Sequence, residues 1–251
     1  MSKSSTVPGG SSPGTALWEF DHGHGAMPWA GATAPDVTAL QQIRGIPSRR
    51  GAGHVPTFAY SVTVGAHLRL ESGLEHDLVR ELDRRPDVMW LVAQPAKIRV
   101  VREGEKRVWH VPDLLSVADA GQVTVWDVRP TGRRDDAFWE VAEASKEACR
   151  ALGWAYELFG GMSTVRRTNL MWLDGYRREM PWYRGALEEF TSVPDEADRF
   201  ELRAVLQADG GAGHLLSAIW FAIRRGLIDC DLNLPMRQDT TLTWRDREMP
   251  T

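Results

Sequence analysis

Residues 111–130 read VPDLLSVADAGQVTVWDVRP, and this stretch decides the fold. The turn-forming run Asp119-Ala120-Gly121 separates two segments rich in valine and leucine, which predicts two neighbouring strands. Side chains alternate along a strand, so we expect Asp127 and Arg129 on one face, at the end of an otherwise apolar row. Charged groups on a central strand are costly unless they are paired or bound to a metal ion. The stretch therefore predicts a sheet and a candidate site at its end.

Helical and extended segments alternate on both sides of this stretch. Upstream, valine, threonine and aromatic residues predict one or two strands over 54–72, and a helix follows over 72–85. The segment VMWLVAQPAKI and a hairpin around Gly104 then lead into residue 111. Downstream we expect a helix at 135–152, a strand in WAYELF and a third helix at 164–177. The core order is thus helix, three strands, helix and strand, an α/β arrangement.

Composition divides the chain into four parts. The Ser/Gly/Pro-rich residues 1–15 are expected to be a disordered tail, and 16–53 an irregular N-terminal arm. The predicted core domain covers 54–180. From 181 to 251 we expect a second domain, with helices near 183–190, 197–208 and 212–226 followed by two short strands. Three helices and a hairpin predict a winged-helix-like fold.

Composition also excludes several classes of protein. No apolar run approaches the roughly 20 residues of a membrane span, and the first residues lack the apolar core of a secretion signal. Two distant cysteines exclude a disulfide scaffold and a cysteine-built zinc site, which favours a cytoplasmic protein. The net charge of −4 gives no global basic surface for nucleic acid, so we expect any DNA contact to be local or assisted by partners.

Asp113 interrupts the strand next to that of Asp127, so the two carboxylates are expected to converge. Carboxylate oxygens from neighbouring strands suit Mg²⁺, with water molecules completing its coordination. The alternative is a structural ion pair between Asp127 and Arg129 at the strand end, and spacing alone leaves both interpretations open. If strand alternation continues from residue 110 to residue 113, His110 lies on the opposite face from Asp113. Both a structural role and a role near the substrate stay open for His110.

Glu75 is a candidate third carboxylate, because the helical pattern places it on the apolar face that leans toward the sheet. In the sequence Ser72-x-x-Glu75, however, the glutamate also matches a capping box at the helix start, and the pattern favours this role. Glu71, at the end of the preceding strand, is the rival candidate for a position beside the metal.

Four segments, in this order and spacing, resemble the TnsA family, the endonuclease subunits of heteromeric cut-and-paste transposases. They are Glu-Ser-Gly-Leu-Glu (71–75), Gln94-Pro95, Val-Pro-Asp-Leu-Leu (111–115) and Trp-Asp-Val-Arg-Pro (126–130). The resemblance spans roughly 55–178 and is to the actinobacterial TnsA-like branch. It implies a restriction-endonuclease-like core, which agrees with the core order expected from the residues.

The resemblance also implies roles for individual residues. Glu75 would be the helix glutamate, Asp113 the metal-binding aspartate and Asp127 the second ligand. Arg129 stands where the nuclease pattern has lysine, and arginine cannot act as a base because it stays protonated. Lys146, on the second helix, is either a displaced catalytic lysine or a solvated surface residue.

The implied activity is hydrolysis of double-stranded DNA at transposon 5′ ends, with Mg²⁺ or Mn²⁺ as the cofactor. A transposase and a regulatory ATPase are the implied partners, and the apolar helix at 212–226 favours protein docking over reading of DNA. The alternative from another class is a catalytically silent adaptor that binds DNA or transposase partners, which the arginine at 129 supports. The third is an unrelated α/β protein whose Asp–Arg set is only structural.

Overall fold

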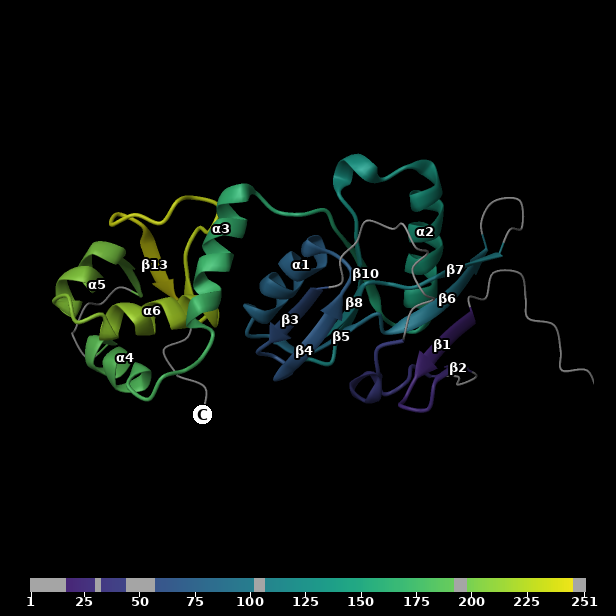
Figure 1. Ribbon diagram of the computed structural model, residues 1–251, viewed down its shortest axis with the longest axis horizontal. Helices are drawn as coiled ribbons and strands as arrows, with labels where there is room; N and C mark the ends of the chain where they lie inside the picture. The colour runs from purple at the N-terminus through teal and green to yellow at the C-terminus, as the bar shows by residue number, and fades with distance from the viewer. Residues whose placement is uncertain (1–16, 30–32, 44–56, 102–106, 192–197, 246–251) are drawn as a thin grey trace, which may run out of the picture.

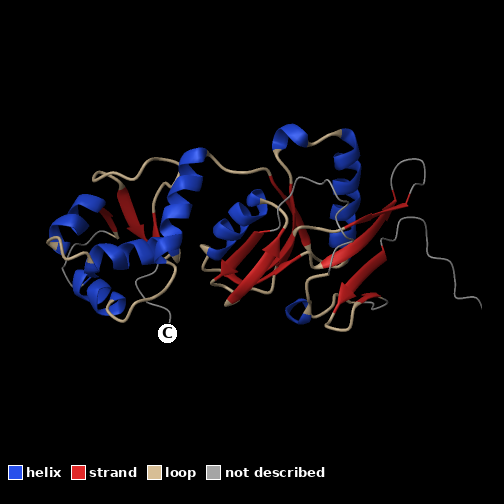
Figure 2. Ribbon diagram, in the orientation of Figure 1, coloured by secondary structure: helices blue, strands red, loops and turns tan. Residues whose placement is uncertain are grey.

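The computed structural model describes residues 17–29, 33–43, 57–101, 107–191 and 198–245, so the tail expected at 1–15 lies outside the described residues. It is a mixed α/β protein with several sheets and, in these ranges, six α-helices (Figures 1 and 2). The mixed α/β class expected from the sequence is therefore confirmed. A sheet-rich unit and a helix-rich unit lie side by side in Figure 1, joined by the segment after β10.

The central sheet has the strand order β10-β9-β8-β5. Its strands are β5 (Val88–Ala93), β8 (Leu114–Ala118), β9 (Val123–Val128) and β10 (Ala155–Phe159), and only the β9–β10 pair is parallel. Alternation along β8 and β9 gives the sheet two apolar faces. One face packs on α1 (Gly73–Asp83) and the other on α2 (Asp136–Ala151), as the two buried clusters show.

Both helices begin where the sequence supplies a capping residue. The Ser72 hydroxyl accepts a hydrogen bond from the Glu75 amide at 3.2 Å, and the Asp135 carboxylate accepts one from the Phe138 amide at 2.8 Å. Such side-chain acceptors satisfy amides that have no partner within the helix. The caps fix the helix starts beside the carboxyl end of β9, which is where the candidate site residues lie.

A second sheet has the order β2-β1-β6-β7 and is antiparallel throughout. Its strands are β1 (Leu17–Asp21), β2 (Ala26–Pro28), β6 (Ala96–Val101) and β7 (Arg107–His110). The β6–β7 pair is the hairpin expected around Gly104, whose turn lies outside the described residues. Part of the arm expected to be irregular is instead extended, because alternate residues Trp18 and Phe20 are buried against Trp154. The short helix η1 (Val37–Ala39) follows in the same segment.

The strands β3 (Thr57–Ser61) and β4 (Ala66–Leu70) form a two-stranded hairpin. Its inner face buries Ala59 and Leu70 in the cluster that contains α1. Its outer face carries exposed side chains in two cross-strand pairs, Phe58 with Arg69 and Tyr60 with His67.

The C-terminal unit has its own apolar core. It contains α3 (Thr164–Leu173), α4 (Tyr183–Thr191), α5 (Leu202–Asp209) and α6 (His214–Arg224), with the short helix η4 (Asp174–Tyr176) directly after α3. The short helix η3 (Thr131–Arg133) lies outside this unit, between β9 and α2. The strands β11 (Arg199–Glu201), β12 (Ile228–Asp229) and β13 (Thr241–Trp244) pair in the order β11-β13-β12. Because α3 buries Leu170 and Leu173 in this core, hydrophobic packing divides the chain between β10 and α3, earlier than residue 180.

Ionic contacts join α1 to the C-terminal unit. The Arg84 guanidinium lies 2.9 Å from Asp229 and also donates to the Ile223 carbonyl at 3.1 Å. Arg224, only 2% exposed, lies 3.1 Å from Asp174 and 3.7 Å from Asp83. None of the described helices combines the length and apolarity needed to cross a membrane.

Candidate functional site

A cleft of about 860 Å³ lies at the end of the central sheet, between the starts of α1 and α2. Five of the six residues singled out from the sequence line it: Glu71, Glu75, Asp113, Asp127 and Arg129. The sixth, Lys146, is exposed on α2 and is not among the lining residues. The structure thus brings the predicted carboxylates and arginine into one cavity and leaves the lysine outside it.

Asp113 and Asp127 face each other across two antiparallel strands. The register pairs Leu114 with Trp126, and continuing it by one residue places Asp113 opposite Asp127. The Asp113 amide donates to the Trp126 carbonyl at 3.0 Å, and its carboxylate accepts from the Val128 amide at 2.7 Å. Directly opposed residues share a face of the sheet, so the two carboxylates converge as expected.

The electrostatics of Asp113 are unfavourable for its charged form. Burial raises the pKa of Asp113 well above its ordinary value, and the nearby carboxylates of Asp127 and Glu75 raise it further. A site that crowds carboxylates in this way is stabilised when a proton or a cation enters it.

Asp127 is held by two groups from other strands. Its side chain is buried, and its oxygens lie 2.8 and 3.0 Å from Nε2 of His110. The Tyr156 hydroxyl also donates to it, and burial together with the Asp127 charge raises the pKa of Tyr156. Tyr156 therefore remains a protonated donor, and the two contacts fix the orientation of the Asp127 carboxylate.

Arg129 lies at the mouth of the cleft and not against Asp127. Its Nε donates to the Arg133 carbonyl at 2.8 Å, and its guanidinium lies 5.6 Å from the centre of the Phe138 ring. In the described part of the chain Asp127 contacts His110 and not Arg129, so the Asp127–Arg129 ion pair weighed from the sequence is not formed. The arginine is exposed, next to Arg133, where it can meet an anion entering the cleft.

Glu75 combines both of the roles considered for it. One carboxylate oxygen accepts from the Ser72 hydroxyl at 2.7 Å, and the other accepts from the Glu71 amide at 2.8 Å. These contacts are those of a helix cap, yet the same carboxylate lines the cleft, where its charge raises the pKa of Asp113. The Glu71 carboxylate instead accepts a hydrogen bond from the side-chain amide of Gln94 at 2.6 Å. The backbone amide of Gln94 donates to the backbone carbonyl of Asp113 at 2.9 Å.

Sequence reasoning missed the roles of His110 and Tyr156. Strand parity placed His110 opposite Asp113, but β7 and β8 belong to different sheets, so alternation does not continue from one to the other. Tyr156 reaches Asp127 because β10 pairs in parallel with β9, with Tyr156 beside Val125. The apolar alternation of WAYELF indicated a strand but carried no information about this register.

The donor set of the cleft fits a hard divalent cation. In the ranges that the structure describes, no group of three or more His, Cys, Asp or Glu side chains is arranged to hold a metal ion. Mg²⁺, however, is usually bound through one or two carboxylates together with water and substrate phosphates. Asp113 and Asp127 provide oxygen ligands of that kind, and a cation would relieve the repulsion that raises the pKa of Asp113.

Replacing Asp113 by asparagine should stabilise the metal-free protein. Because the folded state raises the pKa of Asp113, unfolding releases a proton at any pH between the unfolded and the folded pKa, and stability falls as pH rises through that window. Asparagine keeps an acceptor for the Val128 amide and removes the charge. We expect its melting temperature in EDTA to exceed that of the wild type by roughly 2–4 °C, the shift that about 1 kcal/mol produces at this size.

The measurement is thermal unfolding of both proteins in EDTA from about pH 4, near the pKa of an unfolded aspartate, upward. The difference should be smallest at the acidic end and should grow with pH. A wild type that is as stable as Asp113→Asn throughout would show that the carboxylate is not under electrostatic strain.

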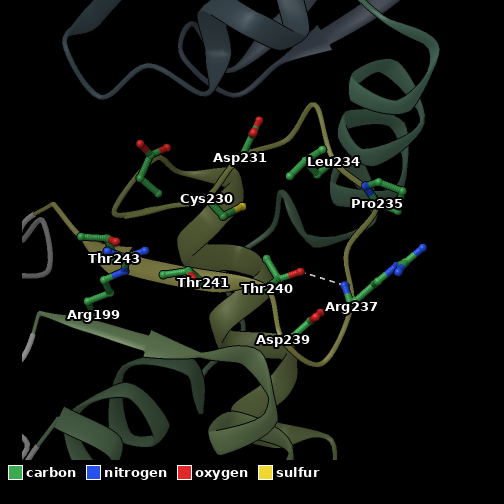
Figure 3. A pocket seen from close by; sticks show the side chains of 11 residues that line it. Arg199, Cys230, Asp231, Leu234, Pro235, Arg237, Asp239, Thr240, Thr241 and Thr243 are labelled. Carbon is green, nitrogen blue, oxygen red and sulfur yellow. Dashed lines mark hydrogen bonds between the residues drawn. The ribbon is translucent and has the colours of Figure 1, made fainter.

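A separate hollow of about 700 Å³ lies in the C-terminal unit, beside β13 (Figure 3). It is bordered by the loop between β12 and β13, where the Arg237 amide donates to the Thr240 hydroxyl at 2.8 Å. Asp229, at its edge, is held by Arg84 and Arg245. None of the site residues predicted from the sequence lines this hollow, so we take the cleft as the candidate functional site.

Comparison of the chain with protein-family models and with curated proteins finds no match.

Proposed function

We propose that this protein is a metal-dependent DNA endonuclease subunit of a heteromeric transposase of the TnsA type, which cleaves at the 5′ ends of a mobile element. One observation carries the proposal: Asp113 and Asp127 oppose each other in a cleft that also contains Glu75 and Arg129. These are the residues that the resemblance selects, and they come from three separate segments of the chain.

The order of the elements supports the same family. Along the chain, α1, β5, β8, β9, α2 and β10 follow one another around a single mixed sheet, with β6 and β7 of the second sheet inserted between β5 and β8. This is the order of helix, three strands, helix and strand that a restriction-endonuclease-like core requires. In this proposal the cleft at the carboxyl end of β9 would be the active site.

In this proposal Asp113 and Asp127 would hold Mg²⁺ or Mn²⁺, with Glu75 beside them. A bound divalent cation lowers the pKa of water and neutralises charge on a scissile phosphate. His110 and Tyr156 keep the Asp127 carboxylate in one orientation, as outer partners of a metal ligand do. Arg129 and Arg133 at the mouth of the cleft would bind the DNA phosphates. Arg129 would not act as a general base, because arginine stays protonated.

The C-terminal unit supports docking of a protein partner more than reading of DNA. The order α4, β11, α5, α6, β12 and β13, with the sheet order β11-β13-β12, supports the winged-helix-like fold expected from the sequence. In such a fold α6 would be the DNA-reading helix, but here most of it is buried and Trp220 packs against Trp172 of α3. An apolar groove of about 710 Å³ that includes the half-exposed Trp172 offers a regulatory ATPase or a transposase a surface instead.

The second candidate is the catalytically silent adaptor, and one observation favours it. The Asp127 carboxylate already receives hydrogen bonds from His110 and Tyr156, and Arg129 is bound to a backbone carbonyl. In an adaptor these contacts would simply stabilise the fold.

The experiment that separates the two candidates is nicking of supercoiled plasmid in Mg²⁺, in Mn²⁺ and in EDTA, with the protein alone and with neighbouring transposase and ATPase proteins. Nicking that requires the cation supports the endonuclease. Absence of nicking in all mixtures, with DNA or partner binding retained, supports the adaptor.

Substitutions of Arg129 test whether arginine serves as an electrostatic group. We expect Arg129→Ala to lower the nicking rate by about a hundredfold, because a positive charge near the phosphate is lost. Arg129→Lys should stay within about tenfold of the wild type, since it keeps the charge but loses the fork geometry. Equal rates for Arg129→Ala and the wild type in a single-turnover assay would remove Arg129 from the mechanism.

A further inference from the structure

Two adjoining pockets lie between the β3–β4 hairpin and the C-terminal unit, with volumes of about 630 and 250 Å³. They share no lining residue with the cleft. Both are rich in arginine, which comes from α1, from the segment after η4, from α4 and from the end of α6. The lining arginines are Arg80, Arg177, Arg178, Arg184, Arg224 and Arg225.

The positive charge exceeds the negative charge here, although the whole chain carries −4. Three carboxylates, those of Asp83, Asp174 and Glu179, line the same pockets. The Asp83 carboxylate accepts a hydrogen bond from the Ser61 hydroxyl at 2.6 Å, and the Asp174 carboxylate accepts one from Arg80 at 2.7 Å. With Asp77, which lies 2.8 Å from Arg80, four carboxylates stand against six arginines and leave a local excess of positive charge that suits an anion.

One buried donor in the smaller pocket has no partner. The Nη1 group of Arg224 makes no hydrogen bond to any described residue, although the side chain is only 2% exposed. An unsatisfied charged donor in the interior is costly. Because Arg224 lines the pocket, a phosphate oxygen entering it would supply the acceptor that the protein itself does not.

Aromatic side chains border the same pockets. Phe58 is 63% exposed and Tyr60 is 41% exposed, both on the outer face of the hairpin. His67 lies edge-on to Tyr60 with 5.3 Å between ring centres, and the Arg177 guanidinium lies 5.8 Å from the Tyr60 ring. Phe58 and Tyr60 thus offer exposed ring surface directly beside the arginines.

We propose that this surface binds single-stranded nucleic acid, with phosphates at the arginines and unpaired bases stacked on Phe58 and Tyr60. Aromatic side chains beside a positively charged groove are the general means by which proteins hold single strands. Duplex DNA would use the arginines but not the rings, since its bases are already stacked on one another. The surface therefore selects unpaired nucleotides, and this binding requires neither a metal ion nor cleavage in the cleft.

The test is fluorescence anisotropy of a labelled oligodeoxythymidylate of about 15 nucleotides, long enough to cross the two pockets, titrated with the full chain in EDTA. We expect Tyr60→Ala to weaken binding about tenfold, because one stacking contact is lost, and Tyr60→Phe to bind like the wild type. Arg177→Ala should weaken binding several-fold and lower the slope of log affinity against log salt by about 0.7. Arg150→Ala, on an exposed pair with Glu147, is the matched control and should change nothing.

Unchanged affinity in both Tyr60→Ala and Arg177→Ala would overturn the inference, and so would equal affinity for a duplex of the same length. The two tests stay separate, because oligonucleotide binding is measured in EDTA whereas the proposed nicking requires the cation. Oligonucleotide binding without nicking would then contradict the proposed endonuclease alone, whereas nicking with no effect of Tyr60 or Arg177 would contradict this inference alone.

Discussion

Asp113→Ala should abolish metal-dependent nicking of supercoiled plasmid, lowering the rate by about a thousandfold or more. The carboxylate is one of two that oppose each other in the cleft, and it provides the charge that would attract the cation. A site left with Asp127 alone would bind the cation weakly, and Asp127 is already shared between His110 and Tyr156. The measurement is the initial nicking rate in Mg²⁺ and Mn²⁺, in the mixture that gives the wild type its highest rate.

Two further variants give this result its meaning. Asp113→Asn preserves an acceptor for the Val128 amide, so an equal loss in this variant assigns the effect to the charge and not to local unfolding. Lys146→Ala changes an exposed residue outside the cleft and should nick at the wild-type rate, which would remove the lysine as a displaced catalytic group. Retention of a tenth or more of the wild-type rate by Asp113→Ala would place the chemistry elsewhere.

The convergence of Asp113 and Asp127 could be predicted from the sequence because it depends only on local rules. Strand alternation and a short turn fix the register of an antiparallel pair, and so place two residues opposite each other. The same locality explains why the capping pattern at Ser72 and the Asp135 start of α2 could be recognised.

The contacts of His110 and Tyr156 depend on tertiary structure and could not be predicted in this way. The chain leaves the second sheet after His110 and enters the central sheet at Leu114, which breaks the count of alternating residues. Tyr156 reaches Asp127 through a parallel pair separated by the whole of α2, and no turn fixes the register of such a pair. The buried strand at Trp18 and Phe20 was missed for a similar reason, since its partner β6 lies far along the chain.

Arg224→Leu should destabilise the protein by about 3–5 kcal/mol, the cost of breaking a buried ion pair by removing one partner. Its side chain is 2% exposed and lies between Asp174, at 3.1 Å, and Asp83, at 3.7 Å. Leucine fills much of the volume but leaves both carboxylates without this cation. The measurement is urea unfolding followed by tryptophan fluorescence, which reports on both units because each buries tryptophan.

Arg150→Leu is the matched control, because its ion pair with Glu147 is exposed and such pairs contribute little, so we expect a change within about 0.5 kcal/mol. Adding Asp83→Asn to Arg224→Leu should recover part of the lost stability, since it removes one uncompensated charge. Recovery would assign the loss to the carboxylates, whereas a loss unchanged by Asp83→Asn would assign it to packing around the guanidinium. A loss below about 1 kcal/mol for Arg224→Leu would mean that Arg84 and its contacts to Asp229 and Ile223 suffice to hold α1 against the C-terminal unit.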